Sequence, residues 1–396
     1  MGAGVRRRRV VLRWLAALIV AVVAVAGCSS GSGGPAGPAD GGAQQQGAPA
    51  QVRIVPAADA TGVAPAEPVT VTAQGGTLGD VAVTAAGRPL TGRYGADRTT
   101  WTSTGRLAFG TRYQVVATAK NTAGQEARQT STFATAKAAA QVFPAVSPLR
   151  GTTVGVGMPI RVYFDAPVTD RKVALAKMAV HTSVPTEGGW RWFSDTEVHW
   201  RPKVYWKAGT QVVLTTDLYG VKLGPGVYGG AKADRRIDFG IGHSHVSVAD
   251  ARTHRFKVYV DGKLTKDFPA SLGKAVSGQH THSGVHVVTD KKRSMTMDST
   301  TYGLALDAGG YRTKVEYATR ISNSGEFVHS APWSVAQQGR ANVSHGCINL
   351  SPTNAAWFFG IARPGDVVEV VGTPVKLTTR ETDVPDWNIP WRQWGE

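Results

Sequence analysis

Residues 327–330 of this chain read FVHS, and residues 344–349 read SHGCIN. Together they place the thiol of Cys347 close in sequence to the imidazoles of His329 and His345. A cysteine nucleophile needs a nearby base, and it needs backbone amides where an oxyanion forms. Gly346 permits an unusual backbone just before the thiol, so we expect the amides of Gly346 and Cys347 to aim at one point. The pattern predicts a nucleophilic cysteine, and spacing alone leaves open which histidine is the base.

The cysteine count supports this prediction. The 396-residue chain has two cysteines, Cys28 and Cys347, and residues 25–28 read VAGC, which resembles a bacterial lipobox. In lipoproteins of that kind the cysteine is acylated and becomes the new N-terminus. Cys347 then has no intrachain partner, and such a thiol in an exported protein either pairs between chains or works chemically. A buried inert thiol is the alternative.

The N-terminus is typical of a targeting segment. Arginines crowd residues 6–13, and the apolar run at 14–27 is too short to span a bilayer comfortably. We expect a signal peptide with a lipobox at 1–27 and a lipid-anchored flexible linker at 28–50, rich in Gly, Pro, Ala and Gln. The predicted location is the outer face of the cytoplasmic membrane and the cell wall.

The net charge of the chain limits the classes of partner that we expect. The formal net charge is +16, which suits anionic partners. The 28 acidic residues are spread along the chain and no long Lys/Arg run occurs, which argues against nucleic acid. Anionic wall polymers and phospholipid headgroups are the expected partners of the basic surface.

Two β-rich stretches, 51–140 and 141–243, precede the cysteine motif. Short Val/Thr runs such as 81–84 and 113–117 alternate with Gly-rich turns, as in a β-sandwich. The stretches look like a repeat, because a Trp and a Gly-Thr pair recur at one offset: Trp101, Gly110 and Thr111, then Trp200, Gly209 and Thr210. Both resemble bacterial immunoglobulin-like domains. Neither holds a cysteine, so packing must replace the inter-sheet disulfide of antibody domains.

The third unit, 244–373, continues the β pattern. Residues 255–260 form a strand, and Asp261-Gly262 predicts a tight hairpin turn after it. One short helix is predicted at 352–361, capped by Ser351, with a proline in its first turn. The tail, 374–396, holds three tryptophans, which rarely hang free in water, so we expect it to dock on this unit.

The stretch from His329 to Asn349 resembles the signature of the L,D-transpeptidase (YkuD-type) catalytic domain: a His, a gap, then Ser-His-Gly-Cys and a polar residue two places on. The similarity covers roughly residues 246–373, and the motif is highly specific. Two immunoglobulin-like modules before such a domain resemble the actinobacterial members. The implied fold is mainly β: two immunoglobulin-like β-sandwich domains followed by a β-rich YkuD-type catalytic domain with a short helix after the nucleophile.

The resemblance implies roles for the motif residues. Cys347 would be the nucleophile and His329 its base, oriented by the backbone carbonyl of Ser330. His345 would lie beside the thiol. The remaining expected positions face the oxyanion or the substrate cleft, and packing is the alternative for several of them: Tyr311, Met297, Ser324, Gly325 and Asn349.

The implied reaction joins two peptidoglycan stem peptides from third residue to third residue through a Cys347 thioester, with release of D-alanine. Carbapenem-type β-lactams are the expected inhibitors. An L,D-carboxypeptidase and a relative that attaches a wall lipoprotein share the site. A non-catalytic wall-binding lipoprotein is the alternative from another class.

Histidines cluster at positions 243, 245, 280, 282 and 286, which makes a metal site an alternative. Zinc needs three or four ligands within tetrahedral reach. The family's fold needs no metal, and we expect no cofactor. The loop histidines, His280 and His282, are expected to be solvated or to line the cleft.

Overall fold

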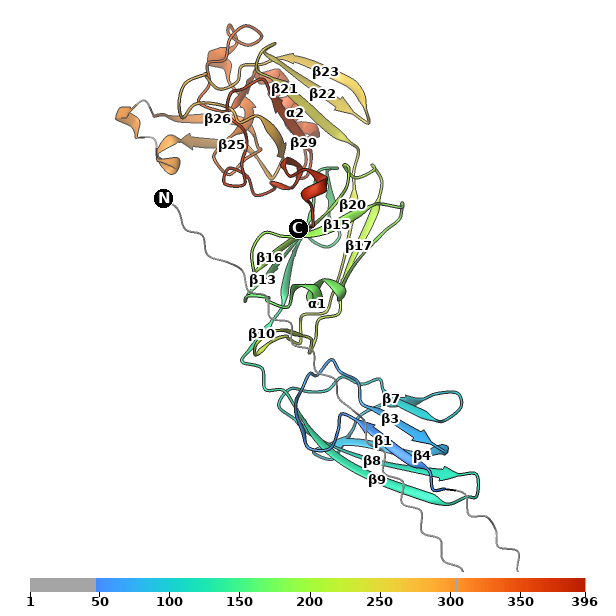
Figure 1. Cartoon of the computed structure of the whole chain (residues 1–396). Helices are drawn as coiled ribbons and strands as arrows, with labels where there is room; N and C mark the ends of the chain where they lie inside the picture. Colours follow the sequence, from blue (N-terminus) through green and yellow to red (C-terminus); the bar gives the residue numbers. More distant parts are fainter. Residues whose placement is uncertain (1–47, 304, 309, 396) are drawn as a thin grey trace, which may run out of the picture. The chain divides into compact units, whose positions relative to one another are not determined.

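The structure is a computed structural model that describes residues 48–303, 305–308 and 310–395 (Figure 1). The predicted signal peptide, Cys28 and most of the predicted linker lie outside the described residues. In the part of the chain that is described, no helix has the length and apolar character needed to cross a bilayer.

The first part is a sandwich of two sheets. One has the order β1-β3-β7-β6, and the other β2-β9-β8-β4-β5. Long strands alternate buried and exposed residues, so one face of each sheet supplies a core around Trp101 and Phe133. The strands are β1 (Gln51–Val55), β2 (Ala60–Val63), β3 (Thr70–Gln74), β4 (Gly76–Ala85), β5 (Arg88–Pro89), β6 (Gly92–Tyr94), β7 (Thr100–Ser103), β8 (Arg112–Asn121) and β9 (Glu126–Thr135).

The second part repeats this plan. Its main sheets have the orders β11-β13-β16-β15 and β12-β20-β17-β14, with a small sheet β10-β19-β18 beside them. The elements are β10 (Ala140–Val142), β11 (Pro144–Ser147), β12 (Thr153–Val154), β13 (Ile160–Phe164), α1 (Arg171–Ala176), β14 (Met178–Thr182), β15 (Gly188–Trp192), β16 (Glu197–Pro202), β17 (Gln211–Thr216), β18 (Lys222–Gly224), β19 (Val227–Gly229) and β20 (Arg235–Ile241).

The repeated tryptophans occupy equivalent places. Trp101 on β7 lies against Gly92 on β6, and Trp200 on β16 lies against Gly188 on β15. A Cβ at Gly92 would come within 2.0 Å of the Trp101 ring, and one at Gly188 within 2.2 Å of the Trp200 ring. Each sandwich therefore uses a glycine on the neighbouring strand to admit its buried indole.

The third part also has two main sheets, with the orders β23-β22-β21-β29-β24 and β25-β26-β27-β28. Its strands are β21 (His245–Asp250), β22 (Arg255–Val260), β23 (Lys263–Pro269), β24 (Gly284–Val287), β25 (Asp290–Asp298), β26 (Arg312–Arg320), β27 (Phe327–Ser330), β28 (Ile348–Leu350) and β29 (Val367–Val371). Helix α2 (Pro352–Ile361) follows β28, and 3-10 turns lie at Ser299–Tyr302, Leu306–Ala308 and Pro332–Ser334.

Two local predictions are confirmed in this part. Helix α2 begins at Pro352, and the hydroxyl of its N-cap Ser351 accepts a hydrogen bond from the Asn354 amide. The hairpin between β22 and β23 turns at Asp261 and Gly262, whose φ angles of 48° and 79° are those of a type I′ turn. Local turn and capping chemistry thus decides both elements.

The tail contacts the second sandwich as well as the catalytic part. Its tryptophan rings surround the Arg201 guanidinium of β16 at 4.8, 5.1 and 4.4 Å, in the order Trp387, Trp391, Trp394. The Trp394 indole also donates to the carbonyl of Gly189 on β15. Asn388 pairs with the backbone of Val285 on β24, which agrees with the predicted docking on the catalytic part, and the indoles have a cation–π partner on the second sandwich in addition.

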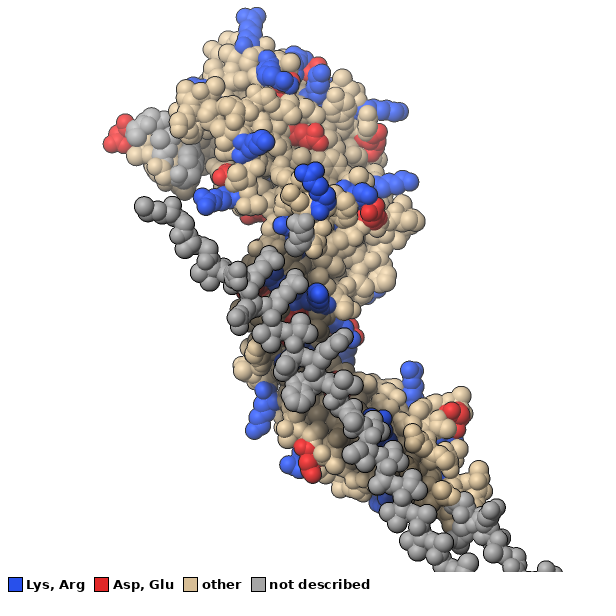
Figure 2. All heavy atoms as spheres, viewed as in Figure 1, with Lys and Arg blue, Asp and Glu red and all other residues tan. Residues whose placement is uncertain are grey.

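The mainly β fold class is confirmed, and the cores fall into separate clusters. The cluster of the first sandwich contains only its own residues, whereas that of the second sandwich also includes Val367 of β29. We propose domain boundaries at 51–140, 141–243 and 244–373 from the division of the sheets, with the tail from 374. On the face drawn in Figure 2, basic side chains are interspersed with acidic ones and form no continuous stripe.

The Gly–Trp contact of the second sandwich yields a stability test. Gly188→Ala should destabilise the protein by about 1–3 kcal/mol, because the added methyl overlaps the buried Trp200 ring. Thermal unfolding measures the loss. Gly189→Ala is the matched control, since its added methyl meets its nearest atom at 3.5 Å, an ordinary contact. Equal melting temperatures for wild type and Gly188→Ala would contradict the packing described.

Candidate active site

The cysteine motif is held by two parallel strands. β27 pairs with β28 so that Val328 faces Ile348 and His329 faces Asn349. Side chains alternate along a strand, so one face of this pair carries Val328 and Ile348 into the core. The other face carries His329 and Asn349, together with Cys347 just before β28, and these three line one hollow. A hydrophobic core on one side thus fixes a polar site on the other.

His329 is oriented by the backbone. Its Nδ1 lies 2.8 Å from the carbonyl oxygen of Ser330, which can only accept, so Nδ1 carries the hydrogen. The neutral ring then has Nε2 free to take a proton. Burial lowers the pKa of His329 to about 4, against the opposing effect of the Ser330 hydrogen bond. The imidazole is therefore neutral at physiological pH.

The thiol of Cys347 is buried between backbone groups. Its Sγ lies 3.6 Å from the carbonyl oxygen of Gly325. Burial raises the pKa of Cys347 to about 12; the Phe327 amide lowers it and the Glu326 carboxylate raises it further. The resting pair is thus a neutral thiol and a neutral imidazole, not an ion pair.

The loop before the thiol is tied down by Ser344. The Ser344 hydroxyl donates to the carbonyl of Cys347 at 2.6 Å and accepts from the amide of Gly346 at 3.1 Å. The Gly346 amide is therefore engaged, and the prediction that it aims at the same point as the Cys347 amide is wrong. Gly346 has a φ of 125°, which favours glycine, and its carbonyl accepts from the Thr281 hydroxyl. Its contribution is to the shape of the loop.

Tyr311 and Met297 separate two hollows. The hollow that holds Cys347 has a volume of 310 Å³, and both residues line it. They also line a second hollow of 310 Å³, which includes Ser324 and Gly325. His345 lines the first hollow, and its ring lies 4.9 Å from that of Tyr311. Burial, with the nearby charge of Lys274, lowers the pKa of His345.

Asn349 is buried beneath the site. Its side-chain amide donates to the Ser334 hydroxyl at 3.1 Å, and its backbone pairs with that of Ser271. These bonds hold the strand that follows Cys347. Asn349 also lines the hollow, so its place is compatible with both expected roles, packing and contact with the substrate.

Comparisons with known proteins agree with this geometry. Residues 244–370 match the family described as the L,D-transpeptidase catalytic domain, and residues 60–222 match a bacterial Ig domain. L,D-transpeptidase 2 of Mycobacterium tuberculosis is 42% identical over 337 residues, which cover 85% of this chain and 81% of that protein. The chain belongs to the L,D-transpeptidase family.

Other relatives agree with that assignment. L,D-transpeptidase 5 of Mycobacterium tuberculosis is 36% identical over 86% of this chain and 75% of its own length. A solved structure of the L,D-transpeptidase LdtMt1 in complex with imipenem shares 39% identity and superposes with a TM-score of 0.50, over 58% of this chain and 99% of that one. The predicted family and its function in peptidoglycan cross-linking are confirmed.

Sequence reasoning about this L,D-transpeptidase missed the groups behind the thiol. Glu326 is buried directly before β27, and it holds His282 at 3.0 Å. His282 and His280 are absent from the lining of the hollows around Tyr311 and both are partly exposed, so of the two expected positions, solvated or in the cleft, the solvated one agrees with the structure. Trp333, whose ring lies 6.0 Å from that of His329, also lines the first hollow. A charged residue beside a buried strand was the available signal for Glu326.

The other histidines have ordinary partners. His245 is buried against Asp366 at 2.9 Å, and His243 is exposed beside Asp261. Among the residues that the structure describes, no group of three His, Cys, Asp or Glu is arranged to hold a metal ion.

The neutral resting pair of this L,D-transpeptidase predicts how the thiol titrates. Because burial favours the neutral thiol, Cys347 should show no thiolate step in ultraviolet absorbance between about pH 6 and pH 10, where an unperturbed cysteine ionises. The difference between wild type and Cys347→Ala isolates this thiol from tyrosine ionisation. A Cys347-dependent step near neutral pH would contradict the neutral pair.

Proposed function

We propose that this chain is a cysteine-dependent acyltransferase in which Cys347 is the nucleophile and His329 the general base. The observation that carries the proposal is their shared hollow at the end of the β27–β28 pair, with the His329 ring fixed by Ser330. As Sγ attacks the donor carbonyl, its proton passes to Nε2 of His329. General-base transfer during attack suits a pair that is neutral at rest.

The proposed donor is a peptidoglycan stem tetrapeptide. Sγ bonds to the carbonyl of the third residue, the bond to D-alanine breaks, and the proton on His329 leaves with the D-alanine amine. A side-chain amine of a second stem then attacks the thioester and frees the thiol. Two hollows that meet at Tyr311 and Met297 offer room for the two stems. Ser324 and Gly325 line the second hollow, and Asn349 and His345 the first.

No cofactor is part of this proposal. Carbapenem-type β-lactams, which imitate the D-alanyl end of the donor, are proposed to acylate Cys347. The imipenem complex of the relative supports this, because that protein shares 39% identity with this chain. Nucleic acid is not a proposed partner.

Intact-mass spectrometry tests the mechanism. Protein lacking residues before Ser29 should gain one acyl adduct from a carbapenem, and should convert a disaccharide tetrapeptide into a cross-linked dimer. Cys347→Ala should do neither, because the nucleophile is gone. Cys347→Ser should be nearly inactive, since a hydroxyl is far less ionised and less nucleophilic than a thiol.

The products decide between the remaining candidates. Tripeptide without dimer indicates an L,D-carboxypeptidase, in which water resolves the thioester. Retention on wall sacculi without any adduct indicates a non-catalytic wall-binding lipoprotein. Full activity in Cys347→Ala contradicts the proposed nucleophile.

We also propose that the protein is exported and held at the membrane through acylated Cys28. The supporting observation is the VAGC sequence at residues 25–28, after a short apolar run and a basic start. Several acyl chains on one cysteine would hold firmly where one chain binds weakly.

Fractionation of producing cells tests the anchor. Wild type should sediment with membranes, and Cys28→Ser should move to the soluble or culture fraction because no acyl group can be attached. Cys347→Ser serves as the matched control, as it removes a thiol elsewhere. Membrane retention of Cys28→Ser would contradict the lipid anchor.

A further inference from the structure

A buried cluster of charged groups lies directly behind the thiol and has no part in the chemistry described above. Its centre is Glu326, which is 3% exposed. Its Oε1 accepts from the backbone amide of His282 at 2.8 Å and lies 3.0 Å from His282 Nδ1. Its Oε2 lies 3.8 Å from Nδ1 of His286, which is 0% exposed. A buried carboxylate needs such partners, because an unpaired charge is costly away from water.

His286 is itself held from two sides. Its Nε2 lies 2.8 Å from the carbonyl oxygen of His282, and its Nδ1 lies 3.2 Å from that of Ile321. Both oxygens only accept, so the ring holds the backbone of Ile321 and that of His282 at once when both of its nitrogens carry hydrogen. The cluster is thus a network of hydrogen-bonded groups centred on two buried residues, Glu326 and His286.

The cluster contacts the reacting sulfur through its neighbours. Gly325, just before Glu326, places its carbonyl 3.6 Å from Cys347 Sγ, and Phe327, just after it, directs its amide toward the same sulfur. The other side of the thiol loop is held by Thr281, whose hydroxyl donates to the Gly346 carbonyl at 2.8 Å. Thr281 and His282 are consecutive residues. Through these bonds they hold the segments that lead into β28 and β27.

We propose that Glu326, held by protonated His282, is a positioning residue for acylation of Cys347. The ion pair keeps Gly325 and Phe327 in place around the sulfur, and the site works at its full rate only while the pair is charged. The inference rests on the proposed cysteine mechanism.

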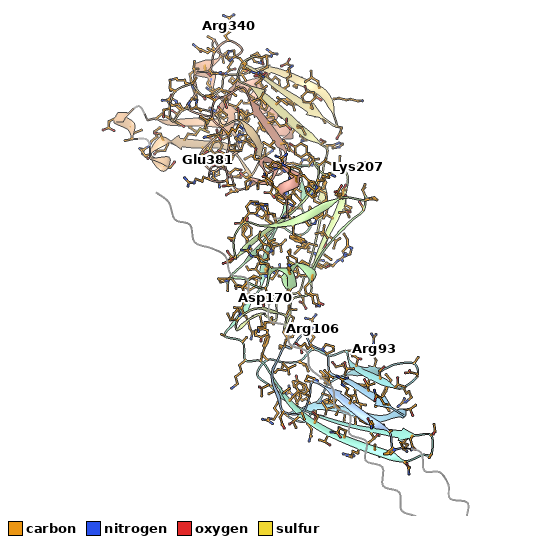
Figure 3. All side chains as sticks on the ribbon, viewed as in Figure 1. Arg93, Arg106, Asp170, Lys207, Arg340 and Glu381 are labelled. Atoms are coloured by element: carbon orange, nitrogen blue, oxygen red, sulfur yellow. The ribbon has the colours of Figure 1, made fainter. Side chains whose placement is uncertain are left out.

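The electrostatics of the cluster agree with this geometry. The hydrogen bond to Glu326 raises the pKa of His282, burial opposes it, and the charges of Glu326 and Glu381 add to the rise. Glu381 comes from the segment after β29 (Figure 3). Burial works against ionised Glu326, but the His282 hydrogen bonds and the charges of His286 and His282 still hold the pKa of Glu326 below its usual range.

The pH window follows from these directions. The raised pKa of His282 means that the pair is complete at low pH and is lost as the pH rises through that value, above 6.5. Glu326 stays ionised throughout this range, since its pKa lies below 4.5. His329 and Cys347, with pKa values of about 4 and about 12, do not titrate in the window. His286 also faces Glu326, at 3.8 Å, so the His282→Gln variant is what assigns a loss of rate above neutral pH to His282.

The test is the pH profile of carbapenem acylation, followed by intact mass from about pH 5.5 to pH 9. The wild-type rate constant should fall about tenfold to a low plateau as the pH rises, the order expected when one charge-assisted hydrogen bond is lost. Glu326→Gln and His282→Gln should each hold the low plateau at every pH. Glu316→Gln, an exposed carboxylate paired with Arg293 on neighbouring β25, should keep the wild-type profile.

Three results overturn the inference. One is a wild-type profile that is flat across the window. Another is a fall of the wild-type rate constant with pH that also occurs, unchanged, in both variants. The third is a variant whose rate drops by the same factor at every pH, which would show a merely structural role. Absence of any Cys347 adduct in the wild type would instead contradict the proposed function itself, so the two failures are distinguishable.

Discussion

The parallel pairing of β27 with β28 is the constraint on which the site depends. In this register Val328, Ile348 and Leu350 enter the core while His329, Cys347 and Asn349 face the hollow. A slip of one residue would exchange the two sets, because side chains alternate with a period of two. The free energy of core burial therefore also holds the proposed nucleophile and base, Cys347 and His329, in register. No separate device is needed to bring residues from the two motif stretches together.

The same burial determines the resting chemistry. Withdrawal of the thiol and the imidazole from water disfavours both charged forms, so the pKa of Cys347 rises and that of His329 falls. A resting thiolate would be the form that reacts with oxidants and metals. In the proposed mechanism the thiol loses its proton only as it attacks, and it is therefore protected until a substrate carbonyl arrives. The site therefore lacks a preformed thiolate, and in return its thiol is more selective in what it reacts with.

Features with local causes could be predicted from the sequence. The Ser351 cap and Pro352 decide where α2 begins, and Asp261-Gly262 decides the hairpin, because each depends only on neighbours in the chain. The motif indicated the proposed nucleophile and base through its resemblance to a known family. The contact of the tail with the second sandwich could not be predicted, because Arg201 and the tryptophans around it are far apart in sequence and no local pattern links them. The hydrogen bond from the Gly346 amide to the Ser344 hydroxyl was missed for another reason. The spacing of residues in the sequence does not show which group a hydroxyl will bond.

Glu326 shows why the charge of a residue near a site does not reveal its role. A carboxylate beside the sulfur raises the pKa of Cys347, so it opposes the thiolate and cannot serve to activate it. A group that only opposed the chemistry would be better replaced by an apolar side chain of similar size, which would also avoid burying a charge. The compensating gain must therefore lie in geometry, and the bonds to His282 are where it can arise, since they fix the backbone on both sides of Glu326. The sulfur is held by that backbone, through Gly325 before the carboxylate and Phe327 after it.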